Sequence, residues 1–126
     1  MTRRIIHTGD APKAIGPYSQ AVAAGGMVFL SGQVGLDPAT GELVRGGLEQ
    51  EARRAFDNLR AVAGAAGPGL GAAVRVTIYL TDLGQFATAN RIMQEYFSEP
   101  YPARVTIGVA ALPRGAAIEV DCILAS

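Results

Sequence analysis

The 126-residue sequence contains few of the residues from which metal sites and catalytic triads are built. It has one cysteine, Cys122, and one histidine, His7. A protein zinc site draws at least three ligands from cysteine, histidine and carboxylate side chains, so this pair predicts no typical metal site. A Ser-His-Asp triad would depend on His7, which falls in an expected edge strand with nothing to orient it. The single cysteine also excludes an internal disulfide.

The chain also lacks an excess of charge of either sign. Eleven basic side chains balance 11 acidic ones. Because nucleic-acid binding draws on cations that neutralise phosphates, this balance disfavours RNA or DNA as the main ligand. No apolar run approaches the roughly 20 residues of a membrane span, and no charged-then-apolar leader opens the chain. We therefore expect a cytoplasmic protein without a membrane partner.

Nucleotide cofactors have no evident binding motif. Glycines cluster in residues 67–71, but this segment follows a helical pattern and precedes a strand pattern, the reverse of a dinucleotide-binding turn. No GxxxxGK motif occurs. The sequence therefore predicts no nucleotide cofactor.

Hydrophobic periodicity predicts a single α+β domain spanning residues 1–126. Helices are expected at 48–66 and from Asp82 to about 97, and strands at 3–7, 20–24, 27–31, 74–80, 104–109 and 117–124. Gly25-Gly26 supplies the turn of a hairpin. This order predicts a mixed sheet of about six strands carrying two helices on one face. The bare face would be buried against copies of the same chain in a cyclic homo-oligomer.

The second helix carries a candidate polar site residue. Asp82 is expected to cap it, in a capping box with Gln85. Its apolar residues recur at steps of three and four and predict a buried stripe of Phe86, Ala89, Met93 and Phe97. Asn90 lies on this stripe, and a buried amide needs partners, either nearby backbone groups or a ligand.

Two charged residues interrupt the apolar closing strands. Arg104 precedes the run 105–109, and Glu119 lies between apolar neighbours. If the helices cover the apolar side of each strand, Arg104 and Glu119 both point to the bare face, together with Thr106. An unpaired buried charge costs about 3–5 kcal/mol, so two interpretations stay open. The two residues form an ion pair across an interface, or Arg104 binds an anionic ligand.

Two further segments carry candidate ligand-binding groups. Gly16-Pro17 sets a turn that presents Tyr18, which either lines a pocket or packs the loop down. Ser31 and Gly32 are expected to end a hairpin strand, where a hydroxyl and an approachable backbone N–H can meet a ligand. Neither pattern is specific by itself.

Several separated motifs occur together and in a fixed order. They are IGPYSQ at residues 15–20, SGQ at 31–33, FATAN at 86–90, PAR at 102–104, LP at 112–113 and IEV at 118–120. In this combination the chain resembles the Rid (YjgF-type, reactive intermediate deaminase) family, Rid A-like subgroup, from about residue 10 to its end. The resemblance implies a chorismate-mutase-like α+β fold and a homotrimer with ligand sites in the clefts between subunits.

The resemblance also implies an activity, that of a 2-iminobutanoate/2-iminopropanoate deaminase. Such an enzyme hydrolyses reactive enamine and imine acids to 2-keto acids and ammonia, without a metal or cofactor. By this resemblance Arg104 would bind the substrate carboxylate, and Glu119 would position or deprotonate the attacking water. The residues that would contact the ligand or shape the cleft are Tyr18, Ser31, Gly32, Asn90 and Thr106.

One departure and two alternatives accompany this hypothesis. Many family members carry cysteine where this chain has Thr106, so a thiol nucleophile is excluded there, while the hydroxyl and the backbone carbonyl remain. A regulatory module could use the same cleft to bind small carboxylates without turnover. An endoribonuclease or translation inhibitor, an activity attributed to some family members, is disfavoured by zero net charge and the absence of a basic, aromatic strip.

Overall fold

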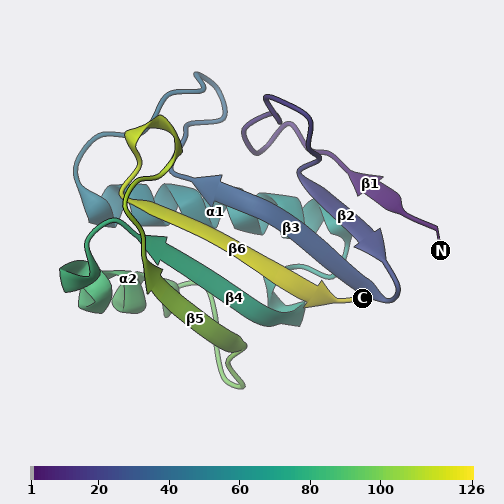
Figure 1. Ribbon diagram of the computed structural model, residues 1–126. Helices are drawn as coiled ribbons and strands as arrows, with labels where there is room; N and C mark the ends of the chain where they lie inside the picture. The colour runs from purple at the N-terminus through teal and green to yellow at the C-terminus, as the bar shows by residue number, and fades with distance from the viewer. Residues whose placement is uncertain (1) are drawn as a thin grey trace.

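Six strands form one mixed sheet, and two α-helices lie against one of its faces (Figure 1). The computed structural model describes residues 2–126. The elements are β1 (Arg4–Ile6), β2 (Ala21–Ala24), β3 (Met27–Val34), α1 (Leu48–Ala66), β4 (Ala73–Leu80), α2 (Phe86–Met93), β5 (Ala103–Gly108) and β6 (Ile118–Ala125). Short 3₁₀ turns are η1 (Leu70–Ala72), η2 (Leu83–Gln85) and η3 (Pro113–Gly115). The expected order of helices and strands is confirmed.

The strand order across the sheet is β1-β2-β3-β6-β4-β5. The β4 and β5 strands are parallel, and the other neighbours are antiparallel. The connection through α2 therefore joins two parallel strands and leaves β5 at an edge. The β6 strand, which carries Glu119, runs between β3 and β4 (Figure 1). No helix within residues 2–126 is long and apolar enough to cross a membrane.

The hydrophobic core lies between the helices and the sheet. The buried stripe of α1 follows the predicted spacing and comprises Leu48, Ala52, Ala55, Phe56, Leu59, Val62, Ala63 and Ala66. The Phe56 ring stacks on Tyr96 with centroids 5.2 Å apart and meets Phe97 edge-on at 6.1 Å. These aromatic contacts hold the segment after α2 against α1. As predicted, α1 ends at Gly67, which has φ 112° and donates its N–H to the Gly64 carbonyl.

The start of α2 differs from the expectation. Asp82 caps the 3₁₀ turn η2, where its carboxylate accepts from the Gly84 N–H at 2.9 Å, and the Gln85 side chain makes no capping bond to α2. Phe86 is the first residue of α2 and is exposed instead of buried, with its ring beside the Arg104 guanidinium. The rest of the predicted stripe is buried, with Phe97 reaching the core from the turn beyond the helix.

The β2–β3 hairpin turns at Gly25 and Gly26, whose φ angles of 61° and 76° fit a two-residue turn. The β3 strand continues to Val34. The prediction that Ser31 and Gly32 end this strand is therefore wrong. They lie where the register between β3 and β6 shifts, which marks a β-bulge. Bulges commonly re-aim side chains beside functional sites.

Candidate functional site

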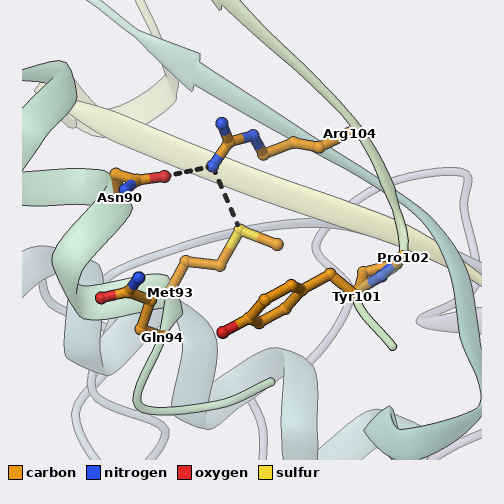
Figure 2. A pocket seen from close by; sticks show the side chains of 6 residues that line it. All are labelled: Asn90, Met93, Gln94, Tyr101, Pro102 and Arg104. Carbon is orange, nitrogen blue, oxygen red and sulfur yellow. Dashed lines mark hydrogen bonds between the residues drawn. The ribbon is translucent and has the colours of Figure 1, made fainter. Parts of the chain in front are cut away.

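Arg104 lies at the wall of a cavity of about 340 Å³ between the β5 edge and α2 (Figure 2). The lining residues are Asn90, Met93, Gln94, Tyr101, Pro102 and Arg104. The sequence placed the arginine and the asparagine in one site, and the structure brings their side chains together. The cavity is large enough for a small organic acid.

Three side chains of α2 fix the Arg104 guanidinium. Its Nη1 donates to the Asn90 side-chain oxygen and lies 3.8 Å from the Met93 sulfur. The guanidinium carbon is 5.2 Å from the centroid of the Phe86 ring, which allows a cation–π contact. Asn90 therefore bonds a side chain and not nearby backbone. Among residues 2–126, Arg104 forms no salt bridge.

Arg104 faces the helices, which contradicts the prediction that it points to the bare face. In the parallel register it pairs with Val76, whose side chain is fully buried under the helix layer. Val105 and Ile107 point to the bare face instead and are 38% and 45% exposed. The prediction was wrong because alternation separates the two faces of a strand without showing which one meets the helices.

Glu119 points to the bare face, as expected. It pairs with Tyr79 of β4, while its neighbours Ile118 and Val120 are buried on the helix side. Its carboxylate lies against Gly32, where a Cβ would come within 2.9 Å of the Glu119 Cδ. The missing side chain at the bulge therefore makes room for the carboxylate. Burial raises the pKa of Glu119, and the negative charge of Asp121 raises it further.

Glu119 and the N-terminal loop line a second cavity of about 560 Å³. Four predicted site residues meet there, namely Tyr18, Ser31, Gly32 and Glu119. Lys13 and Arg114 add two cations to its lining. The sequence patterns did not indicate these two cations, because neither belongs to a motif of known chemistry.

Ser31 holds the loop that presents Tyr18. The Ser31 hydroxyl donates to the Ser19 carbonyl at 2.6 Å, so its proton is not free to bond a ligand. The Tyr18 hydroxyl accepts a long bond of 3.4 Å from the Ile15 N–H, and its ring is exposed at the cavity. Of the two roles considered for Tyr18, the structure favours lining a pocket.

The predicted site residues therefore form two groups on opposite faces of the sheet. One group lies at the β5 edge on the helix side and comprises Asn90, Arg104 and Thr106. The other lies on the β6 side of the bare face and comprises Tyr18, Ser31, Gly32 and Glu119. With β4 between them, β5 and β6 are about 10 Å apart. An ion pair of Arg104 with Glu119 is not formed within one chain.

Known proteins share this fold and match the sequence along nearly the whole chain. Residues 8–126 match the sequence profile of the family described as Endoribonuclease L-PSP, which is the YjgF/Rid family. The chain belongs to this family. Protein DfrA of Myxococcus xanthus is 53% identical over 100% of this chain and 98% of its own length. The Homo sapiens protein named 2-iminobutanoate/2-iminopropanoate deaminase is 44% identical over 98% of this chain and 90% of its own.

Solved structures of Rid proteins have the same fold. RidA from the Antarctic bacterium Psychrobacter sp. superposes with a TM-score of 0.93 at 46% identity, covering 98% of this chain and 99% of that one. The resemblance inferred from the motifs and the chorismate-mutase-like α+β fold are thereby confirmed.

Gln20 is a framework residue of this Rid chain that the sequence interpretation missed. Its side-chain oxygen accepts from the Thr8 N–H at 2.7 Å, and its nitrogen donates to the carbonyls of Thr8 and Pro12 at 3.1 and 3.0 Å. It is buried and closes the loop that carries Tyr18. An amide three residues after the glycine-proline turn was the available indication, because a buried amide needs several partners.

Thr106 and Cys122 both lie on the helix side of the sheet. Thr106 shares the face of Arg104, as predicted, and its buried hydroxyl oxygen has no hydrogen-bond partner among residues 2–126. Burial raises the pKa of the Cys122 thiol to about 12, with a smaller contribution from Asp121. A thiolate nucleophile is thus not available at Cys122 near neutral pH.

Proposed function

We propose that this protein is a 2-iminobutanoate/2-iminopropanoate deaminase, which hydrolyses reactive enamine and imine acids to 2-keto acids and ammonia. One observation carries the proposal. The Arg104 guanidinium is oriented by Asn90 and Phe86 at a cavity wall, without a carboxylate partner among residues 2–126. An arginine held in this way suits a small carboxylate, which it binds by paired, charge-assisted hydrogen bonds. The activity named for the human relative supports an enzymatic role.

Glu119 supplies the proton transfers in this proposal. With the substrate carboxylate on Arg104, water attacks C2 of the protonated imine and Glu119 accepts the proton that the water releases. A C–O bond forms, and the electron pair of the C=N bond moves to nitrogen. Glu119 returns that proton to the nitrogen, the C–N bond breaks with its electron pair leaving on ammonia, and the C2 hydroxyl gives its proton back to Glu119 as the C=O bond of the 2-keto acid forms. The raised pKa of Glu119 suits a group that both accepts and returns a proton.

The proposed site requires a second copy of the chain. Arg104 and Glu119 lie on opposite faces, so one chain cannot present both groups to one small substrate. The bare face exposes Phe29, Val105 and Ile107, apolar side chains that favour burial against another copy. We propose a homotrimer whose clefts join the Arg104 group of one subunit to the Glu119 group of its neighbour. Sedimentation equilibrium should give about three times 13.0 kDa, and a monomer mass would contradict the proposal.

The deaminase activity is tested by coupling to threonine dehydratase, which releases 2-iminobutanoate. Semicarbazide competes for the imine, and 2-ketobutyrate formation is followed. We expect the wild-type protein to accelerate keto-acid formation and Arg104→Ala to lose that acceleration. Arg45→Ala is the matched control, because Arg45 is an exposed arginine that lines neither of the two cavities. The proposal would be refuted if wild-type protein formed 2-ketobutyrate no faster than buffer, or if Arg104→Ala retained full activity.

The same purified protein distinguishes a deaminase from a module that only binds small carboxylates. Calorimetry that detects tight 2-ketobutyrate binding, together with no turnover in the coupled assay, would favour binding without catalysis. The description of the family profile favours a second candidate, an endoribonuclease. Zero net charge and a single histidine weigh against it. Cleavage of RNA by highly purified protein, abolished in Arg104→Ala, would support that candidate.

A further inference from the structure

We propose that Asp121, held by Tyr79, is a positioning residue that sets the charge state of Glu119. The inference rests on the proposed function, in which Glu119 exchanges protons with water and with the substrate nitrogen. It assigns a role to two residues that neither cavity includes among its lining groups. Neither residue would touch the substrate, so each would act through Glu119.

The three side chains form a row on the bare face of the sheet. Tyr79 and Glu119 lie directly opposite each other in the register of β4 and β6. Asp121 follows on the same face of β6, opposite Thr77. Two side chains on one face of a strand and two residues apart are separated by about 7 Å. The Tyr79 hydroxyl donates to the Asp121 carboxylate at 2.8 Å and thereby bridges the two strands.

The hydrogen bonds of the two carboxylates are unequal. The hydroxyl of Tyr79 donates a hydrogen bond to the Asp121 carboxylate. Within residues 2–126, no hydrogen bond or salt bridge reaches the Glu119 carboxylate, which is half-buried against Gly32. Of the two carboxylates, Glu119 is therefore the one without a hydrogen-bond donor to stabilise its charge. Burial is the larger cause of the raised pKa of Glu119, and the charge of Asp121 is the second.

Other titratable groups also surround Glu119. Tyr79 faces it from β4, and β3 contributes no titratable group at this point. Lys13 and Tyr18 of the N-terminal loop and Arg114 of η3 line the same cavity. A nearby cation lowers the pKa of a carboxylate, yet the pKa of Glu119 is raised, by burial first and by the charge of Asp121 second. The effect of Asp121 therefore acts on a group that burial has already made harder to ionise.

The structure offers a matched control for removing the charge of Asp121. Asp57 on α1 accepts a hydrogen bond of 2.7 Å from the Tyr96 hydroxyl, so it forms a second tyrosine–aspartate pair, in the helix layer. Asp57→Asn removes the same charge and weakens the same type of bond as Asp121→Asn. Only Asp121→Asn should change the environment of Glu119.

The decisive experiment is a ¹³C NMR titration of the Glu119 carboxyl carbon in the full-length protein, with the resonance assigned by its loss in Glu119→Gln. Asp121→Asn should lower the titration midpoint of Glu119, and Asp57→Asn should leave it where it is in the wild type. In Asp121→Asn the acid limb of the kcat/KM profile should move to lower pH, because the Glu119 carboxylate stays deprotonated down to a lower pH. An unmoved Glu119 midpoint, or equal shifts in both variants, would overturn the inference.

A second variant keeps the test informative if Asp121→Asn does not fold. Tyr79→Phe removes the hydrogen bond that holds the Asp121 carboxylate in place, so the Asp121 side chain can turn away and the titration midpoint of Glu119 should move to lower pH, as in Asp121→Asn. An unchanged Glu119 midpoint in Tyr79→Phe would overturn the inference. Because the titration requires no enzymatic turnover, it distinguishes failure of this inference from failure of the proposed function. Wild-type protein without deaminase activity would refute the proposed function. An active protein in which Asp121→Asn leaves the titration midpoint of Glu119 unchanged would refute this inference alone.

Discussion

Gly32→Ala should impair catalysis while leaving the fold intact. A Cβ at this position would lie 2.9 Å from the Glu119 Cδ and 3.2 Å from its Cγ. Both distances are shorter than the 3.4–4 Å of an ordinary van der Waals contact. The Glu119 carboxylate also lies within the space that this Cβ would occupy. The side chain of Glu119 must therefore move by about 1 Å or turn away from the bulge.

The size of the effect follows from that displacement. A catalytic group misplaced by about 1 Å costs roughly 100-fold in rate, or about 2.7 kcal/mol of transition-state stabilisation. The backbone at Gly32 does not lie in the left-handed region, so alanine adds no backbone strain there. We expect the free energy of unfolding to change by less than about 1 kcal/mol.

The assay is kcat/KM for imine hydrolysis, measured beside the urea midpoint. Gly71→Ala is the control, because a Cβ at that glycine meets no atom within 4 Å and its backbone is also outside the left-handed region. We expect a loss of about 100-fold for Gly32→Ala and no loss for Gly71→Ala. Full activity of Gly32→Ala, or an equal loss in both variants, would refute the placement of Glu119 over Gly32.

Three further predictions concern the framework of the site. Glu51 of α1 is buried and accepts from the Ala117 N–H at 2.8 Å, so Glu51→Ala should lower the unfolding free energy by about 1–3 kcal/mol in urea; an unchanged midpoint would contradict this. Asn90→Ala removes the acceptor that orients Arg104 and should raise KM roughly tenfold with a smaller change in kcat; an unaltered KM would count against it. The buried Cys122 thiol, with its pKa raised to about 12, should resist iodoacetamide at neutral pH until urea unfolds the chain; equal labelling rates would show that it is accessible.

The sequence predicted the order and spacing of the elements because each one repeats its apolar residues at its own period. The α1 stripe around Phe56 and the turn at Gly25-Gly26 are local patterns, and the structure confirms both. The family was also recognised correctly, because its motifs lie far apart in the chain and still occur in one order. Pairing of distant strands then brings Gly32 beside Glu119.

The faces of the sheet could not be predicted in the same way. Val105 and Ile107 are apolar, so they were assigned to the helix side, but they lie on the bare face. Only the parallel register with β4 shows that Arg104 faces α2. Ser31 and Gly32 likewise lie at a bulge that no local pattern marks. These features are fixed by contacts between strands and by the tertiary packing of α2.

The most direct test of the account asks whether Arg104 of one subunit works with Glu119 of another. Arg104→Ala and Glu119→Gln chains, each inactive alone, are co-expressed with different tags, and trimers that carry both tags are purified. A mixed cyclic trimer holds one complete cleft out of three, so we predict about one third of wild-type deaminase activity. Mixed trimers without activity above that of either parent would contradict a site shared between subunits.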